Sequence, residues 1–328
     1  MSALPGELEQ ALERALVKYR LADMRLATAE LSERYRDRRA RGSGFIAGEL
    51  DAAAYAAYRM PATFAAVRAA LGQLRRRSPD WSPRSLVDVG AGTGSGLWAA
   101  TQVWPEIEFA TLVDGQPEML DLGRALCREA DARMASLTTW RPGDLRTIAS
   151  MPESDLVLAS YTLNELPTAD LHTAIERLWN LSRGVCAIVE PGTPAGFQII
   201  KTVRQVLIAA GAHILAPCPH DDACPMPADD WCHFSVRLPR NRLHREVKPG
   251  ELGYEDEKFS YVAAARIEGS AAPGRILRHP FYRRGMVRLF VCGADGLATR
   301  TVTRRKDRQL YRMARDASWG DEFPPSSD

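Results

Sequence analysis

The chain has 328 residues, of which 45% are hydrophobic and 26% are charged, a composition typical of a globular protein with a sizeable core. No apolar run reaches the roughly 18 residues of a membrane-spanning helix, and the first ten residues lack the basic and apolar regions of a secretory signal. A cytosolic protein without a membrane partner is therefore expected, in which the six cysteines are thiols or metal ligands and not disulfides.

The formal net charge of +2 hides a strong asymmetry. Twelve Lys and Arg residues lie between Arg275 and Arg315, against two acids, Asp295 and Asp307. This segment therefore carries a local charge of +10 and the rest of the chain −8. Positive charge concentrated at one end of a chain favours a polyanionic partner.

Residues 1–77 are expected to form a helical cap that packs on a sheet. Leucines at helical spacing occur near the start: Leu8, Leu12, Leu16 and Leu21. A basic break from Arg34 to Arg41 and a turn at 42–44 precede an alanine-rich helical stretch, 52–74, which is interrupted at Met60-Pro61.

From residue 85 the pattern alternates between strand and helix. Strands are expected at 85–89, 108–113, 133–140, 155–163, 185–190 and 212–216, and helices at 96–104, 117–130, 168–182 and 195–210. Such alternation with short links predicts a doubly wound, Rossmann-like parallel α/β sheet. The expected domains are the cap (1–77), the sheet domain (78–216), a cysteine loop with returning strands and a basic segment (217–315), and a disordered tail (316–328).

A glycine turn follows the first strand, with the pattern Asp88-x-Gly90-x-Gly92-x-Gly94. It lacks the lysine of a phosphate-binding P-loop, and Ser95 stands where the dinucleotide fingerprint needs Gly or Ala. The pattern resembles motif I of class I S-adenosylmethionine (SAM)-dependent methyltransferases. The resemblance implies that these four residues and Ala91 hold SAM, with the acid near its cationic amino-acid end. The alternative is a glycine turn without a ligand.

Two further acids follow strands at the same edge of the predicted sheet. Asp114, followed by Gly115, ends the strand 108–113 at a spacing similar to that of ribose-binding acids. Asp144 follows the third strand, where this fold often places an acid near the adenine amino group. Both are therefore predicted to contact SAM.

The loop after the fourth strand is expected to face the methyl acceptor. It contains Asn164 and Glu165, and Tyr161 before them is suited to stack on a base. It lacks the Asn/Asp-Pro-Pro-Tyr/Phe pattern that amino-methylating enzymes of nucleic acids usually carry. Asn164 and Glu165 either orient an acceptor as catalytic residues or cap the following helix.

Cysteines are concentrated in a proline-rich loop that contains Cys218, Cys224 and Cys232, and Cys292 ends a later strand. Four thiolates suit a structural zinc ion or an iron–sulfur cluster. Gaps of five and seven residues between the loop cysteines favour the larger cluster over paired zinc knuckles. The alternative is free thiols. His220 and His233 are possible substitute ligands, whereas Cys127 and Cys186 are expected in the core.

Several motifs together resemble one family, the methyltransferase-like proteins of the mitochondrial small ribosomal subunit and their bacterial relatives. The motifs are Arg59–Thr63, the glycine turn, Asn164–Leu166, Glu190–Pro194, Ala216–His220, Trp231–Phe234 and Lys258–Tyr261, within residues 50–312. The resemblance implies a class I methyltransferase fold, binding to small-subunit ribosomal RNA during assembly, and a [4Fe–4S] cluster on Cys218, Cys224, Cys232 and Cys292.

The leading hypothesis is a SAM-dependent protein that methylates ribosomal RNA or assists assembly of the small ribosomal subunit. The alternatives are a non-catalytic RNA-binding assembly factor and a small-molecule methyltransferase with a zinc site. A monomer in the bacterial cytoplasm is expected, with a mitochondrial location only if a presequence has been removed.

Overall fold

A computed structural model describes residues 3–36, 46–145, 151–248 and 250–324. Its helices are α1 (Gly6–Leu16), α2 (Leu21–Arg36), α3 (Glu49–Tyr58), α4 (Met60–Arg77), α5 (Ser95–Val103), α6 (Pro117–Ala130), α7 (Ala132–Leu137), α8 (Leu171–Leu181), α9 (Pro194–Ala209), α10 (Arg242–Val247) and α11 (Arg308–Asp316). Single 3-10 turns, η2 (Leu163–Glu165) and η3 (Thr168–Asp170), precede α8.

The strands form two sheets. They are β1 (Ser85–Val89), β2 (Phe109–Asp114), β3 (Thr138–Pro142), β4 (Ser154–Ser160), β5 (Ser182–Pro191), β6 (His213–Ala216), β7 (Phe234–Pro239), β8 (Tyr254–Ala265), β9 (Gly274–Ile276), β10 (Phe281–Arg283), β11 (Met286–Gly293) and β12 (Gly296–Thr303). None of the described helices is long and apolar enough to cross a bilayer.

The larger sheet has the strand order β3-β2-β1-β4-β5-β8-β6, with β7 paired to β8. Strands β1 to β5 run parallel, and β8 is antiparallel to both β5 and β6. A parallel-rich sheet whose strand order reverses beside β1 is the Rossmann-like class I methyltransferase fold. The predicted fold class is therefore confirmed.

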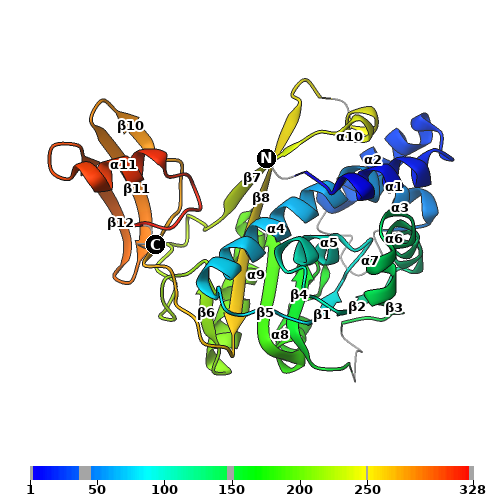
Figure 1. Cartoon of the computed structure of the whole chain (residues 1–328), viewed down its shortest axis with the longest axis horizontal. Coiled ribbons are helices and arrows are strands. Elements are labelled where there is room, and N and C mark those ends of the chain that lie inside the picture. Colours follow the sequence, from blue (N-terminus) through cyan, green and yellow to red (C-terminus); the bar gives the residue numbers. More distant parts are fainter. Residues whose placement is uncertain (1–2, 37–45, 146–150, 249, 325–328) are drawn as a thin grey trace.

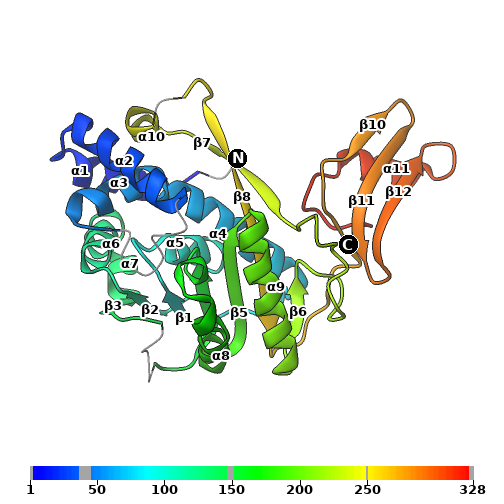
Figure 2. The same ribbon diagram turned by 180° about the vertical axis from the view of Figure 1, so that it is seen from behind.

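Helices cover both faces of this sheet, with α4 and α5 on one face and α8 and α9 on the other (Figures 1 and 2). Alternation along β1 explains the two layers, because successive side chains of a strand point to opposite faces. Leu86 packs into the same core as Leu71 and Leu97, whereas Val87 packs with Ile175 and Val203.

The cap is helical as predicted, but its first helix is shorter than the leucine spacing indicates. Leu8, Leu12 and Leu16 are buried on α1, whereas Leu21 begins α2 and is 39% exposed. The start of the predicted basic break is helical, because Arg34 lies within α2. The rest of the break and the predicted turn fall at residues 37–45, outside the described part of the chain.

Several predicted boundaries are wrong: the strand predicted over 155–163 ends at Ser160, and two others have a clear physical reason. The domain boundary at residue 216 fails because β8 inserts between β5 and β6 and satisfies their backbone hydrogen bonds. The strand predicted over 133–140 is α7 until Leu137, because Asp131 caps that helix by accepting the backbone N–H groups of Arg133 and Met134.

The second sheet, with α11 on one face, forms a lobe beside the larger sheet (Figure 1). The disordered tail predicted over 316–328 is wrong for residues 316–324. Phe323 is buried with the core of this lobe, and Glu322 forms a β-bridge with Arg275. Residues 325–328 lie outside the described ranges.

Candidate functional site: a glycine-turn cavity and a cysteine cavity

The glycine turn lies at the carboxyl end of β1 and leads directly into α5. Gly90, Gly92 and Gly94 have φ angles of +71°, +54° and +88°, which L residues with side chains rarely adopt. A methyl group on Gly90 would also overlap the side chain of Thr162. The backbone here therefore requires glycine on two separate grounds.

Asp114 lies at the carboxyl end of β2 and faces the turn. Its carboxylate accepts the backbone N–H of Gly92 at 2.8 Å and that of Gln116 at 2.9 Å. Burial raises the pKa of Asp114, and hydrogen bonds from the Gln116, Gly92 and Gly115 backbone lower it. The turn and the acid are therefore held together before any ligand binds.

A large open cavity lies over these residues, with about 1890 Å³ of space that includes its mouth. Three of the predicted cofactor residues line it: Gly90, Gly92 and Asp114. It is also lined by groups from the cap, the β4 and β5 ends and β8: Tyr55, Arg59, Thr63, Tyr161, Thr162, Asn164, Glu165, Gly192, Thr193, Glu257 and Lys258. The cavity is therefore at the edge where class I folds place their ligand.

Other predicted cofactor residues are not among those that line the cavity: Asp88, Ala91, Gly94, Gly115 and Asp144. Asp88 is fully buried beneath the turn, and burial, with the charge of Asp114, raises its pKa to about 8. Both of its carboxylate oxygens are buried without a hydrogen-bond partner within the described residues, and its contact with the amino-acid end of SAM stays a prediction.

Both residues of the predicted catalytic pair, Asn164 and Glu165, lie at the cavity, beside the buried acid Glu190. The Asn164 amide donates to Glu190 Oε2 at 2.9 Å, and the Leu163 backbone N–H donates to Oε1 at 2.9 Å. Burial raises the pKa of Glu190 to about 7, although the Asn164 hydrogen bond opposes it. Burial, together with Asp114 and Glu190, raises the pKa of Glu165 to about 8. Both residues thus line the cavity, and the amide of Asn164 is in addition held by Glu190.

A network that the sequence did not indicate closes one side of the cavity. Tyr161 has a φ of +57°, and its hydroxyl donates to Glu257 at 2.7 Å. Both terminal nitrogens of Arg59 also donate to Glu257, at 3.2 and 3.3 Å. Arg59 lies in a motif named above for the family resemblance, but nothing local in the sequence links it to Tyr161 or to β8.

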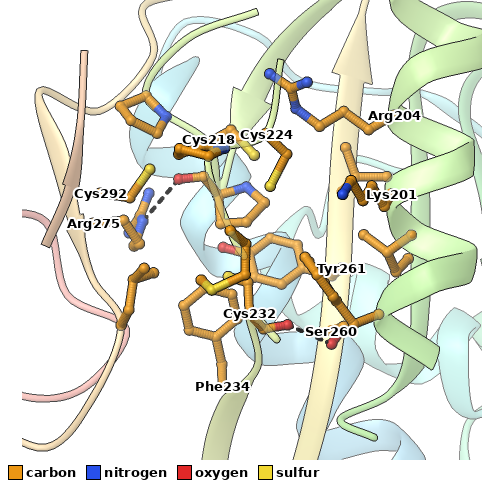
Figure 3. A pocket seen from close by; sticks show the side chains of 18 of the residues that line it. Lys201, Arg204, Cys218, Cys224, Cys232, Phe234, Ser260, Tyr261, Arg275 and Cys292 are labelled. Atoms are coloured by element: carbon orange, nitrogen blue, oxygen red, sulfur yellow. Dashed lines mark hydrogen bonds between the residues drawn. The ribbon is translucent and has the colours of Figure 1, made fainter. Parts of the chain in front are cut away.

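All four predicted cysteine ligands line a second, narrower cavity between β8, α9 and the small sheet, with about 640 Å³ of space that includes its opening to solvent (Figure 3). The loop that carries three of them has neither helix nor strand between β6 and β7. It is attached by hydrogen bonds from Ser260 to the Cys232 carbonyl at 2.8 Å and from the Trp231 indole to the Gly192 carbonyl at 3.0 Å.

Burial favours the neutral form of the cysteine thiols, and nearby arginines oppose it at Cys218. Burial raises the pKa of Cys218, and Arg204 and Arg275 lower it. Burial and the other three cysteines raise the pKa of Cys232. As placed, no three His, Cys, Asp or Glu side chains in the described residues form a group that could hold a metal ion. The four residues therefore share one cavity, and their role as ligands stays a prediction.

Two arginines of the predicted basic segment bind other parts of the chain, and one of them, Arg275, is buried. Arg275 is 1% exposed and donates to the carbonyls of Pro217 at 3.1 Å and Gly320 at 3.0 Å. Arg278 pairs with Asp230 in the cysteine loop. The remaining ten cations are exposed: Arg283, Arg284, Arg288, Arg300, Arg304, Arg305, Lys306, Arg308, Arg312 and Arg315. The basic surface is therefore on the small sheet and α11.

Comparison with known proteins adds a family to this geometry. The family model described as mitochondrial small ribosomal subunit Rsm22 matches residues 49–324. A human protein named ribosome assembly protein METTL17, mitochondrial, is 31% identical over 300 residues, which cover 83% of this chain and 64% of that protein. The Schizosaccharomyces pombe Rsm22-cox11 tandem protein 2, mitochondrial, is 25% identical, with 83% and 43% covered. The chain thus spans less than two thirds of the length of these relatives.

Among solved structures, a magnesium protoporphyrin IX methyltransferase from Synechocystis PCC 6803 with bound S-adenosylhomocysteine has a TM-score of 0.43 and 14% identity. The match covers 75% of this chain and 100% of that one. The strand order, and not this distant likeness, carries the assignment of the fold.

Proposed function

This chain belongs to the mitochondrial small ribosomal subunit Rsm22 family, and on that premise we propose that it binds SAM and acts on the small ribosomal subunit during its assembly. One observation carries the proposal: the glycine turn with its positive φ angles and Asp114 meet in an open cavity at the carboxyl edge of the sheet. The human relative is named a ribosome assembly protein, and the basic lobe suits ribosomal RNA as the partner.

The cavity offers SAM an acidic group and an uncrowded backbone. SAM carries a sulfonium and an ammonium group, and Asp114 lines the cavity, whereas Glu165 with its raised pKa is neutral at pH 7. The bare backbone of Gly90 and Gly92 lets a ligand approach where a Cβ would collide. The lone pairs that remain on Asp114 are available to ribose hydroxyls. When bound, SAM supplies an electrophilic methyl group, and the chain's own task is to hold it and exclude water.

Replacing Asp114 by alanine is expected to weaken SAM binding by about 1–3 kcal/mol, because the ribose hydroxyls and the Gly92 N–H lose their acceptor. Calorimetry with SAM and with its demethylated product measures the effect. Asp121→Ala is the matched control, since that acid is exposed on α6. A wild-type protein that binds neither compound at millimolar concentration contradicts the SAM site.

Methyl transfer to ribosomal RNA is a second candidate, favoured by Glu165 in the cavity. With a pKa near 8, Glu165 is protonated in neutral solution and becomes a base only as the pH rises through about 8. Transfer of tritium from labelled SAM to small-subunit RNA is therefore expected to rise over that range in the wild type and to be flat in Glu165→Gln. Absence of label on naked, precursor and mature particles alike favours the non-catalytic assembly factor.

A [4Fe–4S] cluster on Cys218, Cys224, Cys232 and Cys292 is the third part of the proposal. Their shared cavity supports it, as does the length of the irregular loop that carries three of them. Bound there, the cluster supplies ligand bonds that order the loop. Zinc on the same residues is the alternative. The proposed location is the bacterial cytoplasm, whereas the curated relatives carry mitochondrial names.

A further inference from the structure

One face of the small sheet is covered by α11, and the other face is open at its β10 end but packs against the main core at Phe290 and Cys292. Val287, Leu289 and Val291 of β11 are buried in the cluster that contains Ala314 of α11. Because side chains alternate along a strand, Met286, Arg288 and Phe290 point to the other face. Figures 1 and 2 show α11 against one side of this sheet.

Strand register places an aromatic ring on the open face, at the edge strand β10. Phe281 of β10 is opposite Arg288 of β11, and Arg288 is opposite Thr301 of β12. Phe281 is 45% exposed. The guanidinium carbons of Arg283 and Arg288 each lie 5.3 Å from its ring centre. Both arginines therefore lie over the ring in cation–π contacts, and the ring stays partly open to solvent.

The positive charge around this ring favours a negatively charged partner. Between residues 275 and 306 the sequence contains one acid, Asp295, which lies in the turn between β11 and β12. Of the ten exposed cations of the lobe, Arg315 alone has an ion-pair partner within the described residues, Asp316 at 3.2 Å. Alternate threonines of β12, Thr299 and Thr301, are exposed beside Arg288 and add hydroxyl donors suited to phosphate oxygens.

We infer that the open face of the small sheet is a platform on which an unpaired RNA base stacks against Phe281. Arg283 and Arg288 bind the flanking phosphates. An exposed aromatic ring on a basic sheet face is the chemistry that recognises single-stranded nucleic acid, because every base has a π-face and a duplex offers none within its stack. The inference rests on the proposed function, from which it takes RNA as the partner, and adds where and in what form the RNA is bound.

The test compares single-stranded RNA of about ten nucleotides with a duplex of the same sequence, by fluorescence anisotropy. A 2-aminopurine at the centre of the single strand reports stacking directly. Phe281→Ala is expected to weaken binding of the single strand about 5- to 150-fold and to abolish quenching of the probe, with duplex binding unchanged. Phe281→Trp is expected to retain both. Phe109→Ala is the matched control, because Phe109 is 67% exposed on β2 of the larger sheet.

The outcomes separate this inference from the proposed function. If Phe281→Ala binds the single strand within twofold of the wild type, while joint replacement of Arg304, Arg305, Lys306 and Arg308 by alanine abolishes binding, RNA remains the partner and the platform is wrong. Equal losses for single strand and duplex, or failure of Phe281→Trp, assign Phe281 to the fold and also overturn the platform. Competition by polyglutamate as strong as by RNA does the same.

Discussion

Replacing Cys232 by serine is expected to yield a colourless protein that proteases cut within residues 217–233. Cys232 is the residue to change first, because the other three cysteines of the cavity all raise its pKa. The loop has no regular secondary structure of its own, so few backbone hydrogen bonds offset the entropy of ordering it. If ligand bonds supply that ordering, removing one of four ligands costs the cluster and the order together.

Anaerobic purification, a visible spectrum and analysis for iron, sulfide and zinc measure the first effect, and limited proteolysis measures the second. Cys127→Ser is the matched control, since Cys127 is buried in α6 outside the cysteine cavity. It is expected to keep the wild-type iron content. His220→Ala is informative as well, because its Nε2 lies 3.9 Å from Cys292 Sγ.

The metal content of the wild type decides whether the cysteine cavity holds an iron–sulfur cluster, a zinc ion or free thiols. One zinc without sulfide rejects the cluster and keeps a metal site. A wild type that holds neither metal after anaerobic purification rejects both, and the four residues are then buried thiols. If His220→Ala loses its iron while Cys292→Ser retains it, His220 and not Cys292 is the fourth ligand.

Local patterns predicted what depends on local backbone. The glycine turn is an example, because positive φ angles at Gly90, Gly92 and Gly94 follow from residue type and spacing. Parallel topology followed from the alternation of strand and helix, since parallel strands need crossover helices. Both inferences needed only neighbours in sequence.

Burial of charged groups was beyond the sequence. Asp88 reads as a ligand-binding acid, yet it is fully buried beneath the turn, and Arg275 reads as part of a basic surface, yet it is 1% exposed. The type of a charged residue does not determine whether its side chain is exposed to water or bonded to a buried carbonyl group. That depends on chain segments far apart, here Gln73, Pro217 and Gly320 around Arg275.

The network around Glu257 was missed for a related reason. It joins Arg59, Tyr161 and Glu257, which are separated by about a hundred residues each way and meet only because β8 inserts into the sheet. The insertion was unexpected because returning strands were assigned to a separate region after residue 216. The general lesson is that a strand added late in the chain can supply side chains to a site formed early.

Replacing Gly90 by alanine is expected to lower SAM affinity by about 100-fold or more and the free energy of unfolding by about 1–3 kcal/mol. The new methyl group must enter the space of the Thr162 side chain, at a φ of +71° that alanine rarely adopts. Calorimetry measures binding and thermal unfolding measures stability. Gly72→Ala is the matched control: no atom outside α4 lies within 4 Å of its added methyl group, so binding should not change and stability should rise by about 0.5–1 kcal/mol.

A double variant separates the clash from the backbone strain. Thr162→Gly removes all three side-chain atoms that the new methyl group would meet, the hydroxyl, the methyl group and the Cβ, and leaves the φ of residue 90 as it is. If the clash dominates, Gly90→Ala with Thr162→Gly should regain most of the stability lost in Gly90→Ala, relative to Thr162→Gly alone. If strain dominates, it should regain little. If Gly90→Ala alone binds SAM as tightly as the wild type, neither the clash nor the backbone strain matters for binding. The turn would then tolerate a side chain where this geometry has no room for one.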